Sequence, residues 1–176
     1  MLYLIRLSAF CLALIALPAL AQQRPATPAQ QSAQAGPRQL GNFRDWTAAT
    51  YQENGQKICY AFTRASKTEP NRQGVVLTVT HRPAGRDAVA LAAGYAYPRN
   101  AEVTMAIGQT NLPFYTGGSS AFARDGAAVV AAMRGGSRAV MRGPGAGGRG
   151  TANDQISLAG FSAAYDAIAR ECPVRR

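Results

Sequence analysis

Short stretches of β-branched and aromatic residues, separated by turn signals, fill most of the chain after residue 40. The clearest stretch is 74–81, where Val, Leu and Thr follow one another almost without interruption, a composition that favours a β-strand. Asn54-Gly55 lies between two such stretches, and this dipeptide supplies the positive φ angles of a tight hairpin turn. Strands are predicted at 43–51, 58–63, 74–81, 88–97, 102–107, 139–142 and 154–158. The pattern therefore predicts a protein built mainly from strands.

A proline changes the prediction for one further stretch. Residues 111–116 have the composition of a strand, but Pro113 has no N–H group to donate to a sheet ladder. We therefore expect this stretch to form a short strand at the edge of the sheet.

Two stretches carry helical signals instead. Asp125 precedes the alanine-rich residues 126–134, and glycines follow them, as expected for the start and end of a helix. Apolar residues recur with helical spacing in 161–170. The predicted fold is a mainly β single domain, a β-sandwich or rolled antiparallel sheet, with two short helices, one of them C-terminal. Trp46 and Phe161 are the aromatic residues expected in its core.

The N-terminus has the three parts of a cleavable secretory signal. Arg6 provides the charged region, an apolar run follows it, and Ala19-Leu20-Ala21 forms a small-residue cleavage site. The apolar run is shorter than the about 20 residues that a membrane-spanning helix needs. We therefore predict a signal peptide over 1–21, cleaved between Ala21 and Gln22, and no transmembrane segment in the mature chain.

Residues 22–39 are rich in Gln, Ala and Pro and show no helix or strand period. Such a segment buries too little apolar surface to offset the entropy lost on ordering it. We therefore expect a disordered linker over 22–39, followed by one folded domain over 40–176.

Two cysteines remain after the signal is removed, because Cys11 leaves with it. In an exported protein the usual state of two such cysteines is one disulfide, here between Cys59 and Cys172. This bond would join an early strand to the end of the last helix, and two free buried thiols are the alternative. A metal site is less favoured, because His81 is the single histidine that could add a ligand.

The chain is strongly basic, and its positive charge comes almost wholly from arginine. Loss of Arg6 with the signal lowers the formal net charge only from +10 to +9. The arginines do not form basic runs with interleaved aromatic residues, so nucleic acid is not an expected partner. For an exported protein the expected anions are lipid headgroups, anionic envelope polymers and acidic host surfaces. A general effect on solubility is the alternative.

Residues that could carry out catalysis are scarce. His81 is the single imidazole, and its place at the end of a strand favours a solvated strand terminus. A set of Ser157, His81 and Asp154 is discarded, because no nucleophile elbow surrounds the serine. The glycine-rich residues 143–150 lack the Gly-Lys-Ser/Thr ending of a phosphate-binding loop and are expected to be a flexible connector. We therefore predict no catalytic residues, no cofactor-binding residues and no metal ligands.

Several of these landmarks occur in the same order in a known family. They are the signal peptide, Phe43-Arg44-Asp45-Trp46, Cys59, Gly135-Gly136, and the ending from Ile156 to Ile168 followed by Cys172-Pro173. Over residues 40–173 the chain resembles the invasion-associated locus B family of exported proteins of Gram-negative bacteria. The resemblance implies a periplasmic or envelope-associated protein, linked in some host-associated bacteria to entry into host cells, without established enzymatic activity. Relatives often carry a cysteine soon after the Trp, whereas residues 47–50 have none, so no second disulfide is expected.

Three functions are compatible with the sequence. The first is a non-enzymatic envelope protein, periplasmic or secreted to the outer surface, that binds an envelope or host protein, an anionic polymer or lipid headgroups and aids host-cell interaction. The second is a periplasmic hydrolase of cell-wall or lipid substrates, which would need a deep pocket containing His81 or clustered carboxylates. The third is an inhibitor of a host or competitor enzyme. We take the first as the leading hypothesis.

Overall fold

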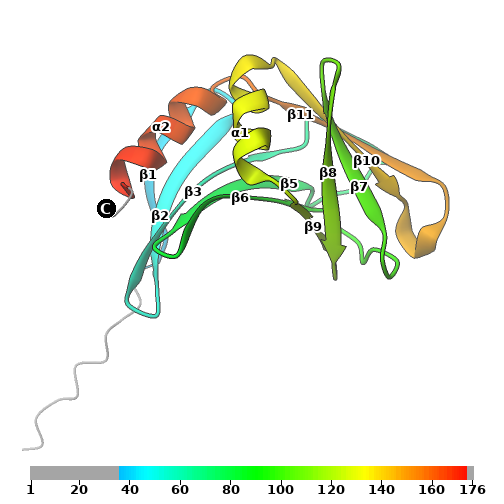
Figure 1. Cartoon of the computed structure of the whole chain (residues 1–176), viewed down its shortest axis with the longest axis horizontal. Helices are drawn as coiled ribbons and strands as arrows, with labels where there is room; N and C mark the ends of the chain where they lie inside the picture. Colours follow the sequence, from blue (N-terminus) through cyan, green and yellow to red (C-terminus); the bar gives the residue numbers. More distant parts are fainter. Residues whose placement is uncertain (1–35, 174–176) are drawn as a thin grey trace, which may run out of the picture. The chain divides into compact units, whose positions relative to one another are not determined.

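The computed structural model describes residues 36–173, and the predicted signal peptide with its Ala21–Gln22 cleavage site lies outside them. The described chain forms one antiparallel sheet of 11 strands and two α-helices (Figure 1). The strands are β1 (Arg38–Phe43), β2 (Trp46–Glu53), β3 (Gln56–Arg64), β4 (Lys67–Glu69), β5 (Val76–Arg82), β6 (Gly85–Ala92), β7 (Glu102–Ile107), β8 (Thr110–Gly117), β9 (Ser120–Ala123), β10 (Arg138–Pro144) and β11 (Thr151–Ser157). The helices are α1 (Gly126–Gly135) and α2 (Phe161–Glu171), and a short 3-10 turn, η1 (Ala146–Gly148), lies in the glycine-rich connection between β10 and β11. This is the mainly β single domain that the sequence predicted, in the form of a rolled sheet.

The sheet curls until β11 and β4, at one of its ends, lie next to the end of β3. Its strand order is β1-β2-β3-β5-β6-β9-β8-β7-β10-β11-β4. β4 follows β3 in the chain but pairs with β11, and the N–H of Ser66, between β3 and β4, donates to the carbonyl O of Gln155 at 2.8 Å. β3 pairs with β2 and β5, whereas β4 pairs with β11 at the other end of the sheet. The segment that contains β3 and β4 therefore closes the sheet around the core.

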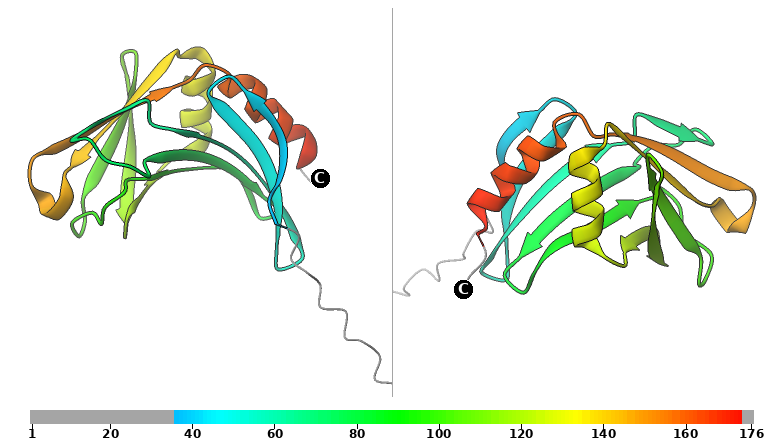
Figure 2. Two further views of the ribbon diagram at one scale, coloured as in Figure 1. Left: turned by 180° about the vertical axis from the view of Figure 1, so that it is seen from behind. Right: turned by 45° about the horizontal axis from the view of Figure 1, so that its top comes forward.

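Both helices lie on the same face of the sheet (Figure 1 and Figure 2). α2 packs on β1, β2 and β3, and α1 packs on β6. In the contact of α2 with the sheet, the rings of Trp46 and Phe161 are both fully buried, with their centroids 4.9 Å apart. The Nε1 of Trp46 donates to the carbonyl O of Ser157 at 2.9 Å, so the polar atom of the buried indole has a partner.

Local turn and capping signals set where the strands and helices begin. Asn54 and Gly55 have φ angles of 51° and 75°, which form the tight turn between β2 and β3. The Asp125 carboxylate accepts an N–H of the first turn of α1 at 2.9 Å. Gly160 precedes α2 with a φ of 90°, and a Cβ atom there would collide with the carbonyl O of Phe43. Glycine at this position therefore allows α2 to approach the sheet closely.

The prediction that residues 111–116 form an edge strand is wrong. β8 spans 8 residues and lies between β9 and β7. β9 pairs with β8 only from Phe114 onward, and the carbonyl O of Pro113 accepts from the N–H of Arg124, just beyond β9. The nitrogen of Pro113 faces the same side as its carbonyl O, toward Arg124, so the bond that proline cannot make falls at the end of the β8–β9 ladder and not within it.

Two other predicted strands are interrupted by residues with positive φ. The stretch 43–51 is divided by Arg44, whose φ is 55°, so that it contains the end of β1 and most of β2. The strand predicted over 88–97 ends at Ala92, and Gly94 turns the chain with a φ of 77°. β1 also begins at Arg38, slightly before the predicted start of the domain.

A disulfide joins Cys59 of β3 to Cys172, which follows the last residue of α2, and their Cα atoms are 6.1 Å apart. This is the pairing expected from the sequence. Cys59 is fully buried, and the bond crosses 113 positions of the chain. It therefore fixes the C-terminal end of α2 on the sheet.

Replacing Cys172 by Ser should lower the free energy of unfolding by about 4 to 5 kcal/mol, because a bond that closes so long a loop removes entropy from the unfolded chain. Urea denaturation with and without a reductant measures this change. The reductant should lower the stability of the wild type to that of the variant and leave the variant unchanged. Equal stabilities of the oxidised wild type and the variant would show that the bond does not stabilise the fold.

A buried ion pair joins the loop before β5 to β11. Arg72 Nη2 donates to Oδ1 of Asp154 at 2.6 Å and also contacts Oδ2, and the two side chains are 13% and 3% exposed. The Nε of Arg72 donates to the carbonyl O of Ala93 at 2.9 Å, and its guanidinium lies 5.0 Å from the centroid of the Tyr95 ring. These contacts satisfy two charges that folding removes from water.

Asp154→Ala should lower the free energy of unfolding by about 3 to 5 kcal/mol, because it leaves the Arg72 guanidinium buried without its counter-charge. The exposed pair Lys67–Glu69, whose side chains are 59% and 54% exposed, provides a matched control. Glu69→Ala should cost only about 0 to 1 kcal/mol. Chemical denaturation at one salt concentration compares the two variants, and equal losses of stability would contradict the role assigned to the buried pair.

Candidate functional site

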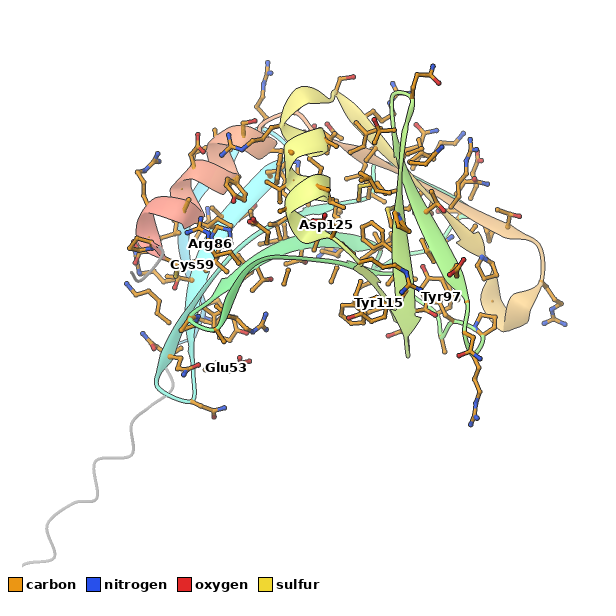
Figure 3. The ribbon with its side chains drawn as sticks, viewed as in Figure 1. Glu53, Cys59, Arg86, Tyr97, Tyr115 and Asp125 are labelled. Atoms are coloured by element: carbon orange, nitrogen blue, oxygen red, sulfur yellow. A yellow bond between two sulfur atoms is a disulfide. The ribbon has the colours of Figure 1, made fainter. Side chains whose placement is uncertain are left out.

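A cleft of about 730 Å³ opens beside the disulfide, between the β2–β3 hairpin, the β5–β6 hairpin and the end of α2. Figure 3 shows Arg86 near Cys59, next to the C-terminal half of α2, and Glu53 toward the tip of the β2–β3 hairpin. We call this cleft the basic cleft and define it by its chemically important lining residues, which are Lys57, Arg82, Arg86, Glu171 and Cys172. Three cations and one carboxylate give this set a net positive charge.

The two hairpins and the disulfide bring these residues together. Lys57 stands just after the β2–β3 turn, and Arg82 and Arg86 stand before and after the β5–β6 turn. The disulfide holds the end of α2 beside β3, so that Glu171 and Cys172 complete the lining. The basic cleft therefore exists only in the folded, disulfide-closed chain.

Glu171 is the acidic residue of the basic cleft, and two cations engage it. Its Oε1 accepts from the Nζ of Lys57 at 2.8 Å and from the Nη2 of Arg38 at 2.9 Å. The hydrogen bond from Lys57 lowers the pKa of the Glu171 carboxyl below its ordinary value. Glu171 therefore neutralises part of the charge of Lys57 and is not itself free to bind a cation.

Arg86 is the cation of the basic cleft whose charge is least compensated. Its Nη1 donates to the carbonyl O of Cys172 at 3.2 Å. Within residues 36–173 no carboxylate lies at ion-pair distance from its guanidinium. Arg82, by contrast, has its Nε 3.5 Å from Oε2 of Glu53, and both side chains are nearly half-exposed. Arg86 is therefore the residue best placed to receive an anion.

The surplus of positive charge extends beyond the cleft. All 9 acidic residues of the sequence lie in the described part of the chain, and each accepts a hydrogen bond or faces a cation there. The arginines of the same part that have no carboxylate partner in it are Arg44, Arg64, Arg86, Arg99, Arg138, Arg142, Arg149 and Arg170. The basic cleft is therefore a pocket within a generally cationic surface.

His81 is buried, and the prediction that it is a solvated strand end is wrong. It is 1% exposed and pairs with Cys59 across the β3–β5 ladder. Its Nε2 lies 3.2 Å from Oδ1 of Asp87, which also accepts from the hydroxyl of Tyr165 at 2.7 Å. Burial lowers the pKa of His81, and the positive charge of Arg86 lowers it further. The imidazole is therefore neutral at neutral pH, and its Nδ1 finds no hydrogen-bond partner among the described residues.

Each residue of the discarded Ser157, His81 and Asp154 set has its own partner elsewhere, and His81 contacts Asp87. His81 does not line the basic cleft. The hydroxyl of Ser157 donates to the carboxylate of Asp45, whereas Asp154 binds Arg72. Within residues 36–173 there is no cluster of three or more His, Cys, Asp or Glu side chains that could hold a metal ion. The chemistry that the basic cleft offers is therefore the binding of negative charge.

Fold and cleft together define a disulfide-closed, mainly β domain with a cationic pocket. Residues 46–169 match the family described as invasion associated locus B (IalB) protein, and the chain belongs to this family. The crystal structure of invasion associated protein B from Bartonella henselae has the same fold, with a TM-score of 0.54 and 22% sequence identity over 74% of this chain and 95% of that chain. A comparison with curated proteins finds no match.

Family membership has two consequences for this chain. Proteins of the IalB type are exported, and the Cys59–Cys172 disulfide is consistent with export. The family also points to a non-catalytic role. Neither helix of the described chain combines the length and the apolar character needed to cross a membrane.

Lowering the pH should destabilise the fold through protonation of His81. The pKa of His81 is lower in the folded chain than the ordinary value of 6.5, so the unfolded chain binds more protons below that pH. The stability present above pH 6.5 should be lost as the pH falls toward the folded pKa, by at most about 1.4 kcal/mol per pH unit. Denaturation curves between about pH 7.5 and 5 measure this slope. His81→Gln should reduce the slope, and the same slope in both proteins would assign it to other groups.

Proposed function

We propose that this protein is a non-enzymatic exported envelope protein that binds an anionic partner through the basic cleft. The observation that carries the proposal is Arg86, a cation without a carboxylate partner among residues 36–173, in a cleft of about 730 Å³ that Lys57 and Arg82 also line. Cations grouped along a concave surface raise the local concentration of anions and speed their association. The other unpaired arginines attract an extended anion to the same molecule.

The partner that we propose is a macromolecule of the envelope or of a host surface. The predicted signal peptide over 1–21 and the disulfide both favour a place outside the cytoplasm, in the periplasm or at the outer surface. Envelope polymers, membrane surfaces covered with anionic lipid headgroups and acidic protein surfaces there each present many negative charges. The solved relative is named an invasion associated protein, and by this likeness we propose that binding aids host-cell interaction.

Hydrolysis of cell-wall or lipid substrates has less support. Such an enzyme would need a general acid or base inside its pocket. The buried His81 is absent from the lining of the basic cleft, and the carboxylate of Glu171 is held by Lys57 and Arg38. The arrangement therefore favours binding over catalysis.

Binding of the mature chain, residues 22–176, to immobilised polyphosphate tests the proposal. Arg86→Gln should weaken this binding about fivefold to tenfold, because it removes charged hydrogen bonds to the polymer. Arg149→Gln, which removes the same charge from the β10–β11 connection, should change the affinity much less. Raising the salt concentration should weaken binding of the wild type more than that of Arg86→Gln.

Equal effects of the two arginine substitutions would refute a role for the basic cleft. Such a result would assign the attraction to the overall charge of the chain. Thermal melting of each variant shows whether the fold is retained, since neither Arg86 nor Arg149 is part of an ion pair among the described residues.

A further inference from the structure

The sheet face turned away from the helices carries a groove of about 360 Å³ over β2, β3 and β5. We call it the aromatic groove; its lining residues that matter here are Tyr51, Tyr60, Phe62, Thr78, Thr80 and Arg82. We propose that the anionic partner of this protein is a polysaccharide that contains both neutral and acidic sugars, with its sugar rings in the aromatic groove and an acidic group in the basic cleft. This inference rests on the proposed function and names the chemical class of the partner.

Strand alternation places the aromatic rings on the surface. Tyr60 and Phe62 alternate along β3 with the fully buried Cys59 and Ala61, so the two aromatic rings lie on the opposite face of the sheet and are half-buried. The rings of Tyr60 and Phe62 are 5.8 Å apart between centroids and inclined by only 26°, and Tyr51 meets Tyr60 edge-on at 5.6 Å. The result is an aromatic platform that lines the groove on this face of the sheet.

Hydroxyl groups lie directly beside this platform. Thr80 pairs with Tyr60 across the β3–β5 ladder, and Thr78 pairs with Phe62. Each ring therefore has a threonine as its neighbour on the same face of the sheet. A sugar ring has an apolar C–H face, which packs on an aromatic ring, and hydroxyl groups around its rim, which exchange hydrogen bonds with side-chain hydroxyls. The aromatic groove offers both kinds of contact side by side.

The aromatic groove and the basic cleft meet at Arg82. This side chain lines both, and Tyr51 of the aromatic groove is followed in the chain by Gln52 of the basic cleft. A polymer chain that lies over Tyr60 and Phe62 can therefore continue past Arg82 toward Arg86. The combined surface fits an extended ligand better than a single headgroup.

The distribution of charge selects among extended anions. Arg82 is the single charged residue in the lining of the aromatic groove, whereas the basic cleft adds Lys57 and Arg86. Nucleic acid and polyphosphate carry a negative charge on every unit, and most of these charges would lie along an uncharged platform. A polysaccharide of alternating neutral and acidic sugars places apolar ring faces on the platform and its acidic groups near the cations.

Affinities of the mature chain for six polymers at one salt concentration test the inference. Hyaluronan alternates neutral and acidic sugars, polygalacturonate and alginate carry a carboxylate on every sugar, dextran is a neutral polysaccharide, polyphosphate is an anion without sugar, and oligothymidine is a nucleic acid. We expect hyaluronan to bind more tightly than the other five polymers, because only its sugars alternate between neutral and acidic. If polygalacturonate, alginate or polyphosphate binds at least as tightly as hyaluronan, charge alone governs binding and the inference is overturned; tightest binding of oligothymidine would assign the groove to nucleic acid.

Substitutions that remove a ring but keep apolar volume test the platform itself. Phe62→Leu should weaken binding of the preferred polysaccharide about threefold to tenfold, whereas Phe62→Tyr should retain it. Tyr115→Leu is the matched control, because Tyr115 is 47% exposed and lies away from the β2–β3 hairpin (Figure 3). Polyphosphate binding should not change in Phe62→Leu. Thermal melting confirms that each variant is folded.

The two proposals fail in different ways. If Phe62→Leu binds the polysaccharide as tightly as the wild type while Arg86→Gln still weakens polyphosphate binding, the polysaccharide inference is overturned and the proposed function stands. If Arg86→Gln changes neither affinity, the proposed function fails, and with it the inference that rests on it.

Discussion

The attachment of α2 to the first three strands is the constraint on which the rest of the structure depends. It has two anchors, the ring contact of Trp46 with Phe161 near the start of the helix and the Cys59–Cys172 disulfide just beyond its end. Gly160 permits the close approach of α2 to the strands, because a Cβ atom at this position would collide with the backbone of Phe43. The same attachment covers His81 and brings Cys172 to the basic cleft. Core and candidate site are therefore products of one tertiary contact.

β3 connects the fold to both parts of the proposed binding surface. One face of the strand gives Cys59 and Ala61 to the core, and the other gives Tyr60 and Phe62 to the aromatic groove. Lys57, at the start of β3, lines the basic cleft. A shift of β3 by one residue would exchange its two faces, so the disulfide also fixes which side chains can meet a ligand.

The local elements were predictable, because their signals lie in adjacent residues. The Asn54-Gly55 turn, the Asp125 cap and the periodicity of α2 each required only a short window of sequence. The interior place of β8 was not predictable, because Pro113 is tolerated only where β9 has already ended. Such a condition depends on the length of a strand that is distant in the chain.

The candidate site was predictable only in its chemistry. The sequence indicated a basic exported protein that binds anions, but the arginines that gather at the basic cleft come from separate hairpins. The burial of His81 did have a signal, because it is in phase with the core residues Leu77 and Val79 of β5.

The pairing of acidic residues with cations leaves Arg86 and several other arginines without a compensating charge among the described residues. Arginine keeps its proton at every pH a folded protein encounters, and the one imidazole is enclosed in the core. The surface charge is therefore nearly constant from mild acid to mild base, and ionic strength is the variable in the surroundings that can release a bound anion.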